Sequence, residues 1–385
     1  MKKLSSNASL PQSGIRRMFD IAKDMDDVIS FCLGEPDFDT PLHIKESAKK
    51  YLDLGFTHYS DNAGILELRQ AIALNLEKYD KLKYDATSEI QVTIGGMQAI
   101  YILMSTLLDA GDEVLVADPC YANYIGEIKM NHGIPVAVPV YEVNNFNYTY
   151  EDLCKKVTNK TKALILNSPC NPTGAVADEK TLNDIARFAC EYDLYVIYDA
   201  VYKHLLYDDF KYINIATLPG MKDRTLVVDS FSKTYAMTGW RLGYIAGPKE
   251  IISNIPKLQE NMVSCAPAFI QYAGIEALQN GDNDIKIMNE EYTKRRKVLL
   301  KGIDDIPKLS YIKPYGAFYL FINISKTGLT SVEFCERLLK EQGVVLAPGS
   351  AFGKLDDDFV RLSYATSITN IEKGLVKIKA FVDSL

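Results

Sequence analysis

Short apolar runs rich in β-branched residues alternate with helical stretches along most of the chain, and this alternation constrains the fold more than any other feature. Several runs are apolar at almost every position, which predicts strands buried on both faces in a mostly parallel sheet. The runs fall at residues 89–96, 112–119, 161–169, 194–200 and 225–232, and helical stretches at 97–111 and 179–192 lie between them. The pattern predicts an α/β layered domain.

The last hundred residues have a different character. A long helix with a polar face is predicted over residues 283–303, followed by strands at 316–324 and 358–365 and helices at 331–343 and 370–385. Because 385 residues exceed what one ordinary core holds, we expect two domains. The predicted division is an N-terminal arm with part of the small domain at 1–45, a large α/β domain at 46–284, and a small α+β domain at 285–385.

Composition excludes several partners. The net charge is −7 and no basic run is present, which argues against nucleic acid. No stretch approaches 18 consecutive apolar residues and the first residues lack the apolar core of a signal peptide, so we expect a soluble cytoplasmic protein with no membrane partner. Seven scattered cysteines without metal-like spacing predict buried thiols in a reducing compartment and no metal site.

Ligands of open parallel sheets bind beyond the carboxyl ends of the strands, so the residues that follow each run are the candidates for chemistry. Gly95 and Gly96 separate a strand from a helix, where exposed backbone N–H groups suit a phosphate; an ordinary turn is the alternative. Asn171 lies in a proline-fixed turn after the run at 161–169 and could direct its amide into a cleft. A purely structural loop explains that turn equally well.

A carboxylate and a lysine follow the next two runs. Asp199 ends a buried strand, which is costly unless it meets a cation such as a protonated ring nitrogen, and Tyr202 could donate to a nearby oxygen of the same ligand; a helix N-cap is the alternative for Asp199. Lys233 is either a solvated surface group or an amine whose pKa burial lowers, which would make it a nucleophile and base.

Two arginines complete the candidate set. Arg241, with Ser230 and Ser232, would suit a phosphate through its bidentate fork. Arg361 lies inside an otherwise apolar strand and needs an anion to face; a substrate carboxylate is one candidate and an interdomain salt bridge is the other.

The order of these features resembles that of the class I/II aminotransferases of fold type I, which use pyridoxal 5′-phosphate. The stretch SFSKTYAMTGWRLG at 230–243 matches that family's lysine signature SxSKxxxxxGxRxG, and the resemblance extends from SFCLGEPDFDTP at 30–41 to VRLSYATS at 360–367. It implies a fold type I PLP-dependent transferase, with a mostly parallel central sheet in the large domain.

The resemblance also implies a role for each candidate. Lys233 would hold the cofactor as a Schiff base, Asp199 would pair with its ring nitrogen, and Tyr121 would stack on the ring. Tyr202 and Asn171 would meet the phenolic oxygen, while the phosphate would be held by Ser230, Ser232, Arg241 and the backbone of Gly95, Gly96 and Met97. The substrate α-carboxylate would bind to Arg361 and the Gly34 backbone, beside Asn171.

The family's subunit arrangement and reaction follow in the same way. Tyr59 matches the tyrosine that reaches the phosphate of a neighbouring subunit, which implies a homodimer with shared active sites. The implied reaction moves an amino group from an L-amino acid to a 2-oxo acid, with 2-oxoglutarate the expected acceptor, by a ping-pong mechanism.

The substrate stays open at this point. Met97 stands where some bacterial aspartate aminotransferases carry a lysine for the distal carboxylate, and Ile15, Tyr121 and Phe318 are expected near the pocket. The donor is therefore aromatic, otherwise neutral, or aspartate. The alternative functions are a carbon–sulfur β-lyase on the same fold and a regulator that has lost catalysis.

Overall fold

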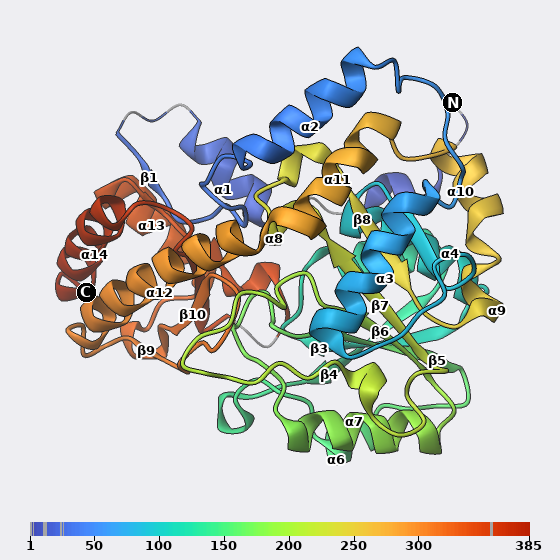
Figure 1. The fold of residues 1–385 in the computed structure, drawn as a ribbon. Helices are drawn as coiled ribbons and strands as arrows, with labels where there is room; N and C mark the ends of the chain where they lie inside the picture. Colours follow the sequence, from blue (N-terminus) through green and yellow to red (C-terminus); the bar gives the residue numbers. More distant parts are fainter. Residues whose placement is uncertain (1, 3, 11–13, 24, 26, 355–356) are drawn as a thin grey trace.

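A seven-stranded sheet forms the centre of the protein in the computed structural model, which describes residues 2, 4–10, 14–23, 25, 27–354 and 357–385 (Figure 1). Strand β8 runs antiparallel to its two neighbours, β2 and β7, and the other neighbouring pairs are parallel. In sheet order the strands are β2 (Ile90–Thr93), β8 (Gly243–Ala246), β7 (Thr225–Ser230), β6 (Tyr195–Asp199), β5 (Thr161–Asn167), β3 (Glu113–Asp118) and β4 (Ile134–Pro139). The predicted mostly parallel sheet is confirmed.

Helices cover both faces of this sheet because successive strand residues point to opposite sides. Val114 and Val116 of β3 join one apolar cluster, and Leu115 between them joins the other. The first cluster is covered by α4 (Gly95–Leu107), α5 (Asn123–Met130), α9 (Lys249–Ile252) and α10 (Ile255–Val263). The second is covered by α3 (Leu66–Asp80), α7 (Glu179–Glu191) and α11 (Ala268–Asn280). Burial on both faces explains the continuous apolar runs.

A smaller antiparallel sheet lies beside the first. Its strands, in order, are β12 (Ala347–Pro348), β13 (Phe359–Ser363), β10 (Tyr319–Asn323) and β9 (Ser310–Tyr311). A further parallel pair joins β1 (Ile29–Ser30) to β11 (Val344–Val345), so the N-terminal segment contributes a strand to the C-terminal part of the chain.

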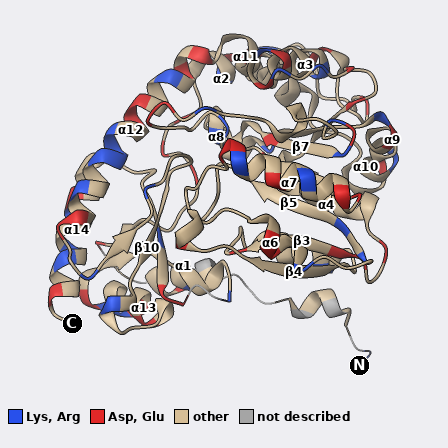
Figure 2. Cartoon of the chain, turned by 90° about the horizontal axis from the view of Figure 1, so that it is seen from below, with Lys and Arg blue, Asp and Glu red and all other residues tan. Residues whose placement is uncertain are grey.

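The remaining helices connect and cover these sheets. They are α1 (Gly14–Ala22), α2 (Leu42–Asp53), α6 (Tyr150–Cys154), α8 (Phe231–Thr234), α12 (Asp282–Asp304), α13 (Ser331–Gln342) and α14 (Ile368–Asp383). Short 3₁₀ turns occur at Ser6–Ser9, Glu142–Asn144, Ile215–Thr217, Thr238–Trp240, Ser325–Thr327 and Gly349–Ala351. Figure 2 shows α12 and α14 along one side of the molecule with charged residues on their outer surfaces, as the polar face of the predicted long helix requires.

The predicted domain boundaries after residues 45 and 284 stay a prediction, and the second of them falls within α12. The prediction of buried cysteines is only partly right, because Cys190 is exposed and Cys154, Cys170 and Cys265 are half-buried. Cys190 lies near the end of α7, on a helix that covers the sheet with one face only. Within the described ranges, the helices are too short or too polar to cross a membrane.

Candidate active site

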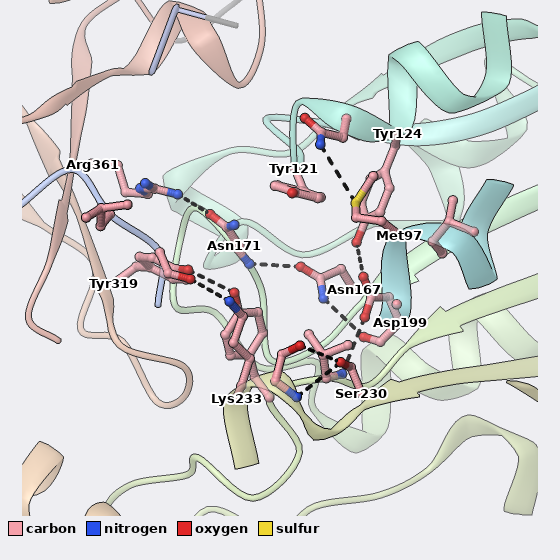
Figure 3. Close-up of a pocket in the computed structure, with 18 of the residues that line it drawn as sticks. Met97, Tyr121, Tyr124, Asn167, Asn171, Asp199, Ser230, Lys233, Tyr319 and Arg361 are labelled. Atoms are coloured by element: carbon pink, nitrogen blue, oxygen red, sulfur yellow. Dashed lines mark hydrogen bonds between the residues drawn. The ribbon is translucent and has the colours of Figure 1, made fainter. Parts of the chain in front are cut away.

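A cavity of about 460 Å³ opens where β5, β6 and β7 end, between the large sheet and β10 and β13 of the small one (Figure 3). All the predicted site residues except Gly95 and Tyr59 line it: Gly34, Gly96, Met97, Tyr121, Asn171, Asp199, Tyr202, Ser230, Ser232, Lys233, Arg241 and Arg361. The strand ends of the large sheet and the arginine strand of the small sheet therefore meet in one place, although their residues are far apart in the chain.

Asp199 is a buried carboxylate without a cation. It is the last residue of β6, and its side chain accepts hydrogen bonds from the Tyr124 hydroxyl and, at 3.3 Å, from the Val201 N–H. Burial raises the pKa of Asp199 to about 6, and the structure shows no ion-pair partner for it among the residues it describes. No helix starts directly after β6 in this part of the chain, so the N-cap alternative is wrong.

Lys233 is a half-buried amine, also without a counter-ion among the described residues. It lies in the single-turn helix α8, which Ser230 caps by accepting a hydrogen bond from the Ser232 N–H at 3.2 Å. Its Nζ donates to the Gly34 carbonyl oxygen at 2.5 Å. Burial lowers the pKa of Lys233 to about 8; the Glu35 charge opposes this decrease, and the charges of Arg361 and Arg241 add to it. The alternative of a solvated surface lysine is wrong.

Positive charge gathers where α4 begins. Gly95 is its first residue and has a φ of +77°, and a Cβ there would lie 2.6 Å from Nη2 of Arg241, so only glycine lets the guanidinium pack against this turn. Arg241 is itself anchored by a 2.7 Å hydrogen bond to the Thr238 carbonyl oxygen. The Ser230 hydroxyl contacts that of Ser232 at 2.9 Å beside them. A helix N-terminus, a guanidinium and two hydroxyls in one place suit an anion such as phosphate.

Arg361 lies at the opposite end of the cavity, in the middle of β13, and is 2% exposed. Its Nη1 donates to Oδ1 of Asn171 at 2.8 Å and its Nη2 to the Cys32 carbonyl oxygen at 2.6 Å, whereas its buried Nε has no hydrogen-bond partner. Within the described chain it pairs with no carboxylate, so the salt-bridge alternative is not supported. The bond to Arg361 occupies Oδ1 of Asn171 and leaves Nδ2 as its donor for a ligand.

Several cavity residues were not predicted, notably Tyr124, Asn167 and Tyr319. Asn167 is the last residue of β5 and donates from Nδ2 to the Asp199 carbonyl oxygen at 3.0 Å, so the strand-end rule applied to every strand would have found it. Tyr124 follows Tyr121 by three residues, which is helical spacing toward the same side. Tyr319 has no such signal, because neither face of its strand is marked in the sequence.

Of three residues that were expected near the site, Phe318, Tyr59 and Ile15, the first two do not line the described cavity. Phe318 is absent from the cavity lining and packs behind it, edge-to-face with Tyr202 at 5.6 Å between ring centroids. It was expected near the pocket, but Tyr319 takes that position because neighbouring residues of a strand face opposite ways. Tyr59 is 88% exposed and lies outside the lining, so its predicted role toward a second subunit stays a prediction. The side chain of Ile15 lies outside the described part of the structure.

An α/β chain with an amine, a carboxylate and two guanidinium groups around one cavity has the groups to bind a small molecule that carries both charges. The chain belongs to the family described as aminotransferase class I and II, whose model matches residues 26–378. It is an aminotransferase, in a family that is generally dependent on pyridoxal 5′-phosphate. This identification disfavours the alternatives of a β-lyase and of a non-catalytic regulator.

Individual relatives agree on the class. The chain is 48% identical to an aspartate aminotransferase of Pyrococcus abyssi and 44% identical to aromatic-amino-acid aminotransferase 2 of Thermococcus litoralis, each over 95% of both chains. The crystal structure of an aromatic aminotransferase from Pyrococcus horikoshii superposes with a TM-score of 0.91 at 45% identity, covering 96% of this chain and 99% of that one. The fold type I architecture is therefore confirmed, while the relatives' names differ in substrate.

Proposed function

We propose that this aminotransferase holds pyridoxal 5′-phosphate in the cavity and moves the amino group of a neutral, including aromatic, L-amino acid to a 2-oxo acid. One observation carries the proposal: Asp199, Lys233 and Arg361 converge on one cavity, and none has a counter-ion among the described residues. Each lacks what one part of the cofactor and substrate would supply, namely a protonated ring nitrogen, a carbonyl carbon and a carboxylate.

The residues present fit the cofactor. Asp199 would pair with the protonated ring nitrogen, and Tyr121 supplies an aromatic face for the ring. Tyr202 and Nδ2 of Asn171 are donors for the phenolic oxygen. Ser230, Ser232, Arg241 and the N–H groups of Gly95, Gly96 and Met97 form the phosphate end. When bound, pyridoxal phosphate supplies an electron sink that stabilises negative charge on the substrate α-carbon.

The chain's own groups then have defined tasks. Asp199, ionised above pH 6 and bonded to Tyr124, keeps a proton on the ring nitrogen. Lys233, with its pKa near 8, is neutral often enough at physiological pH to attack a carbonyl carbon, and its Nζ takes the proton from the substrate α-carbon. Arg361 orients the substrate by binding the α-carboxylate. In the part of the chain that the structure describes, its Nε is free to donate to that carboxylate, whereas Nη1 and Nη2 already donate to protein oxygens.

The lining supports a neutral side chain on the donor. Lys233, Arg241 and Arg361 are the cations among the described lining residues. All three already have a proposed task, at the carbonyl carbon, the phosphate and the α-carboxylate respectively. Met97 and Asn123 flank the remaining wall, with Nδ2 of Asn123 at 3.7 Å from the Met97 sulfur. Within the described lining of one subunit, a second carboxylate would meet no further cation, which favours the aromatic specificity named for the Thermococcus litoralis relative over the aspartate specificity named for the Pyrococcus abyssi relative.

The acceptor and compartment belong to the same proposal. We take 2-oxoglutarate as the acceptor and the cytoplasm as the compartment; in the described structure none of the seven cysteines forms a disulfide.

The proposal includes a homodimer with shared active sites. Tyr59 lies in a segment where Leu52, Leu54 and Phe56 are also exposed, and Val263 and Met262 are exposed apolar residues at the end of α10. Exposed apolar groups of this kind favour association with another surface. The molar mass of the protein in solution, and loss of phosphate affinity in Tyr59→Phe, test this part.

The main test is a half-reaction without oxo acid. The holoenzyme mixed with L-phenylalanine alone should stop after one turnover, and adding 2-oxoglutarate should restart it; continuous pyruvate or ammonia release from a sulfur amino acid would instead indicate a lyase. A screen of the standard amino acids and diaminopimelate then ranks the donors. We expect kcat/KM for phenylalanine or tyrosine to exceed that for aspartate by about tenfold or more. A preference for aspartate would overturn the substrate assignment while leaving the transaminase.

A further inference from the structure

Tyr319 is a buried tyrosine at the first position of β10, and the tasks above leave it without a role. It lines the cavity on the same side as Arg361 (Figure 3). Its partner in register on β13 is Ser363, two residues beyond Arg361, so the small sheet carries both groups on one rigid frame.

The Tyr319 side chain contacts three parts of the site. Its hydroxyl lies 2.8 Å from the Tyr202 hydroxyl, and the Arg361 guanidinium carbon lies 4.6 Å from the centre of its ring. A Cβ on Gly34 would lie 2.5 Å from the Tyr319 oxygen, so the glycine backbone fits closely against the hydroxyl. Tyr319 thus joins the arginine of the small sheet to a tyrosine of the large domain.

The direction of the hydrogen bond between the two phenols matters because each has one proton. Burial raises the pKa of both hydroxyls, and the Arg361 charge opposes the increase at both, so the pKa shifts do not set the direction. Among the described residues, the hydrogen bond of the Tyr319 hydroxyl is the 2.8 Å contact with Tyr202, and Tyr319 can satisfy it by donating its own proton. If Tyr319 donates, the Tyr202 oxygen accepts, and the Tyr202 proton is left to point into the cavity.

We propose that Tyr319 is a positioning residue that donates its hydroxyl proton to Tyr202, so that Tyr202 presents its own proton to the phenolic oxygen of the cofactor. Through its ring, Tyr319 also supports Arg361. This inference rests on the proposed function, and it connects the group that binds the substrate carboxylate to the group that sets the charge of the cofactor oxygen.

The test is the pH dependence of the bound cofactor's long-wavelength absorbance in Tyr319→Phe, which removes only the hydroxyl. A hydrogen bond donated to the phenolic oxygen stabilises its ionised form, so weakening that bond raises the midpoint of the absorbance change. We expect an upward shift of about 0.3 to 1 pH unit in Tyr319→Phe and a larger one in Tyr202→Phe. The double variant should match Tyr202→Phe, because Tyr319 acts only through Tyr202.

Tyr364→Phe is the matched control. Tyr364 is equally buried and donates to the Ala317 carbonyl oxygen at 3.2 Å, outside the cavity lining, so its loss should leave the midpoint unchanged. An unchanged midpoint in Tyr319→Phe, or shifts that add in the double variant, would overturn the inference. A wild-type protein with no titrating absorbance at all would instead refute the proposed function.

Kinetics separate the hydroxyl from the ring. Tyr319→Phe keeps the ring against Arg361, so KM for the amino donor should stay within about twofold while kcat falls about two- to tenfold. Tyr319→Leu loses the ring as well and should also raise KM. A Tyr319→Phe variant that raises KM as much as Tyr319→Leu would contradict the assigned division.

Discussion

Lys203 and Lys233 are two lysines at or next to the cavity, and they differ in whether the fold supplies a counter-charge. Lys203 follows Tyr202 and is 4% exposed; its Nζ lies 2.9 Å from Oδ2 of Asp80 and 3.0 Å from Oδ2 of Asp229, which precedes Ser230. Lys233 lies on the cavity and has no carboxylate within ion-pair distance in the described structure. The first charge is neutralised by the fold, and the second is left for a ligand.

The pKa values diverge accordingly. Burial opposes the charge on Lys203, but the carboxylates of Asp229 and Asp80 outweigh it and hold its pKa well above the usual value. Burial dominates at Lys233 and lowers its pKa to about 8. Burial alone therefore does not decide whether a lysine is structural or reactive. The counter-charges supplied by the fold decide it.

Replacing Lys233 by methionine gives the largest expected effect. Transamination should fall by about 10⁴-fold or more, because no other lysine lines the described cavity. The apoprotein should become more stable by about 1–3 kcal/mol at pH 7, because the unpaired charge is removed. Turnover assays and urea unfolding of the apoprotein measure the two effects, and a destabilised apoprotein would show that Lys233 is paired after all.

Replacing Lys203 by methionine should change stability in the opposite direction. Asp80 and Asp229 would be left buried without their cation, at a cost of about 3–5 kcal/mol in the free energy of unfolding. Because the pKa of Lys203 is raised, its contribution is complete below its usual pKa and is lost only as pH rises through the folded value. Urea unfolding should therefore show the full deficit at pH 9 and a smaller one toward pH 6, where the unpaired carboxylates of the variant take up protons. The absence of a deficit at pH 9 would contradict the closed cluster of Lys203, Asp80 and Asp229.

Arg361 and Arg296 extend the comparison to arginines. Arg296 is 1% exposed and binds Asp208 through Nη1 at 3.2 Å and Nη2 at 2.8 Å, whereas the equally buried Arg361 faces the cavity. Arg361→Met should raise KM for the amino donor about 10- to 100-fold, since a charge-assisted fork to the carboxylate is lost. Arg296→Met should lower stability and leave KM unchanged. A raised KM in Arg296→Met with an unchanged KM in Arg361→Met, measured by steady-state kinetics and urea unfolding, would contradict the distinction between a substrate-binding and a structural arginine.

The sequence predicts the unpaired charged residues of the described cavity better than the closed cluster of Lys203, Asp80 and Asp229, for a physical reason. Asp199 ends β6 and Lys233 follows the end of β7, the parallel neighbour of β6, and the geometry of a parallel sheet brings such strand ends together. Asp80, at the end of α3, meets Lys203 across 123 residues through helix packing that no local pattern encodes. The closed cluster was therefore not predicted.

Side-chain direction sets the second limit of prediction. The run GAFYLFINI predicts a strand, but its residues are apolar on both faces, so the pattern does not tell which of Phe318 and Tyr319 faces the cavity. The expectation that Phe318 lies near the pocket is wrong, because Tyr319 lines the cavity instead. Tyr124 was not predicted for a related reason. It lies in α5 and its partner Asp199 ends a strand, and only the packing of this helix against the sheet brings the two side chains together.

The smallest expected effect concerns the pH at which apoprotein captures pyridoxal 5′-phosphate. Burial lowers the pKa of Lys233 from 10.5 to about 8, so the rate of capture should fall about fivefold between pH 8 and pH 7 as the neutral amine is lost. In the same interval Lys203 stays charged. The sign of linkage follows: between pH 8 and 10.5 the unfolded chain binds more protons, so apoprotein stability rises with pH there, and below pH 8 the cost is complete.

Neighbouring charges should move that midpoint in opposite directions. Asp199 raises the pKa of Lys233 and Arg361 lowers it, so Asp199→Asn should shift the midpoint of capture down and Arg361→Met should shift it up, each by less than about one pH unit. Stopped-flow absorbance after mixing apoprotein with the cofactor measures both shifts. Equal shifts in one direction would mean that the variants act through structure and not through charge, because only charge gives Asp199 and Arg361 opposite signs at one amine.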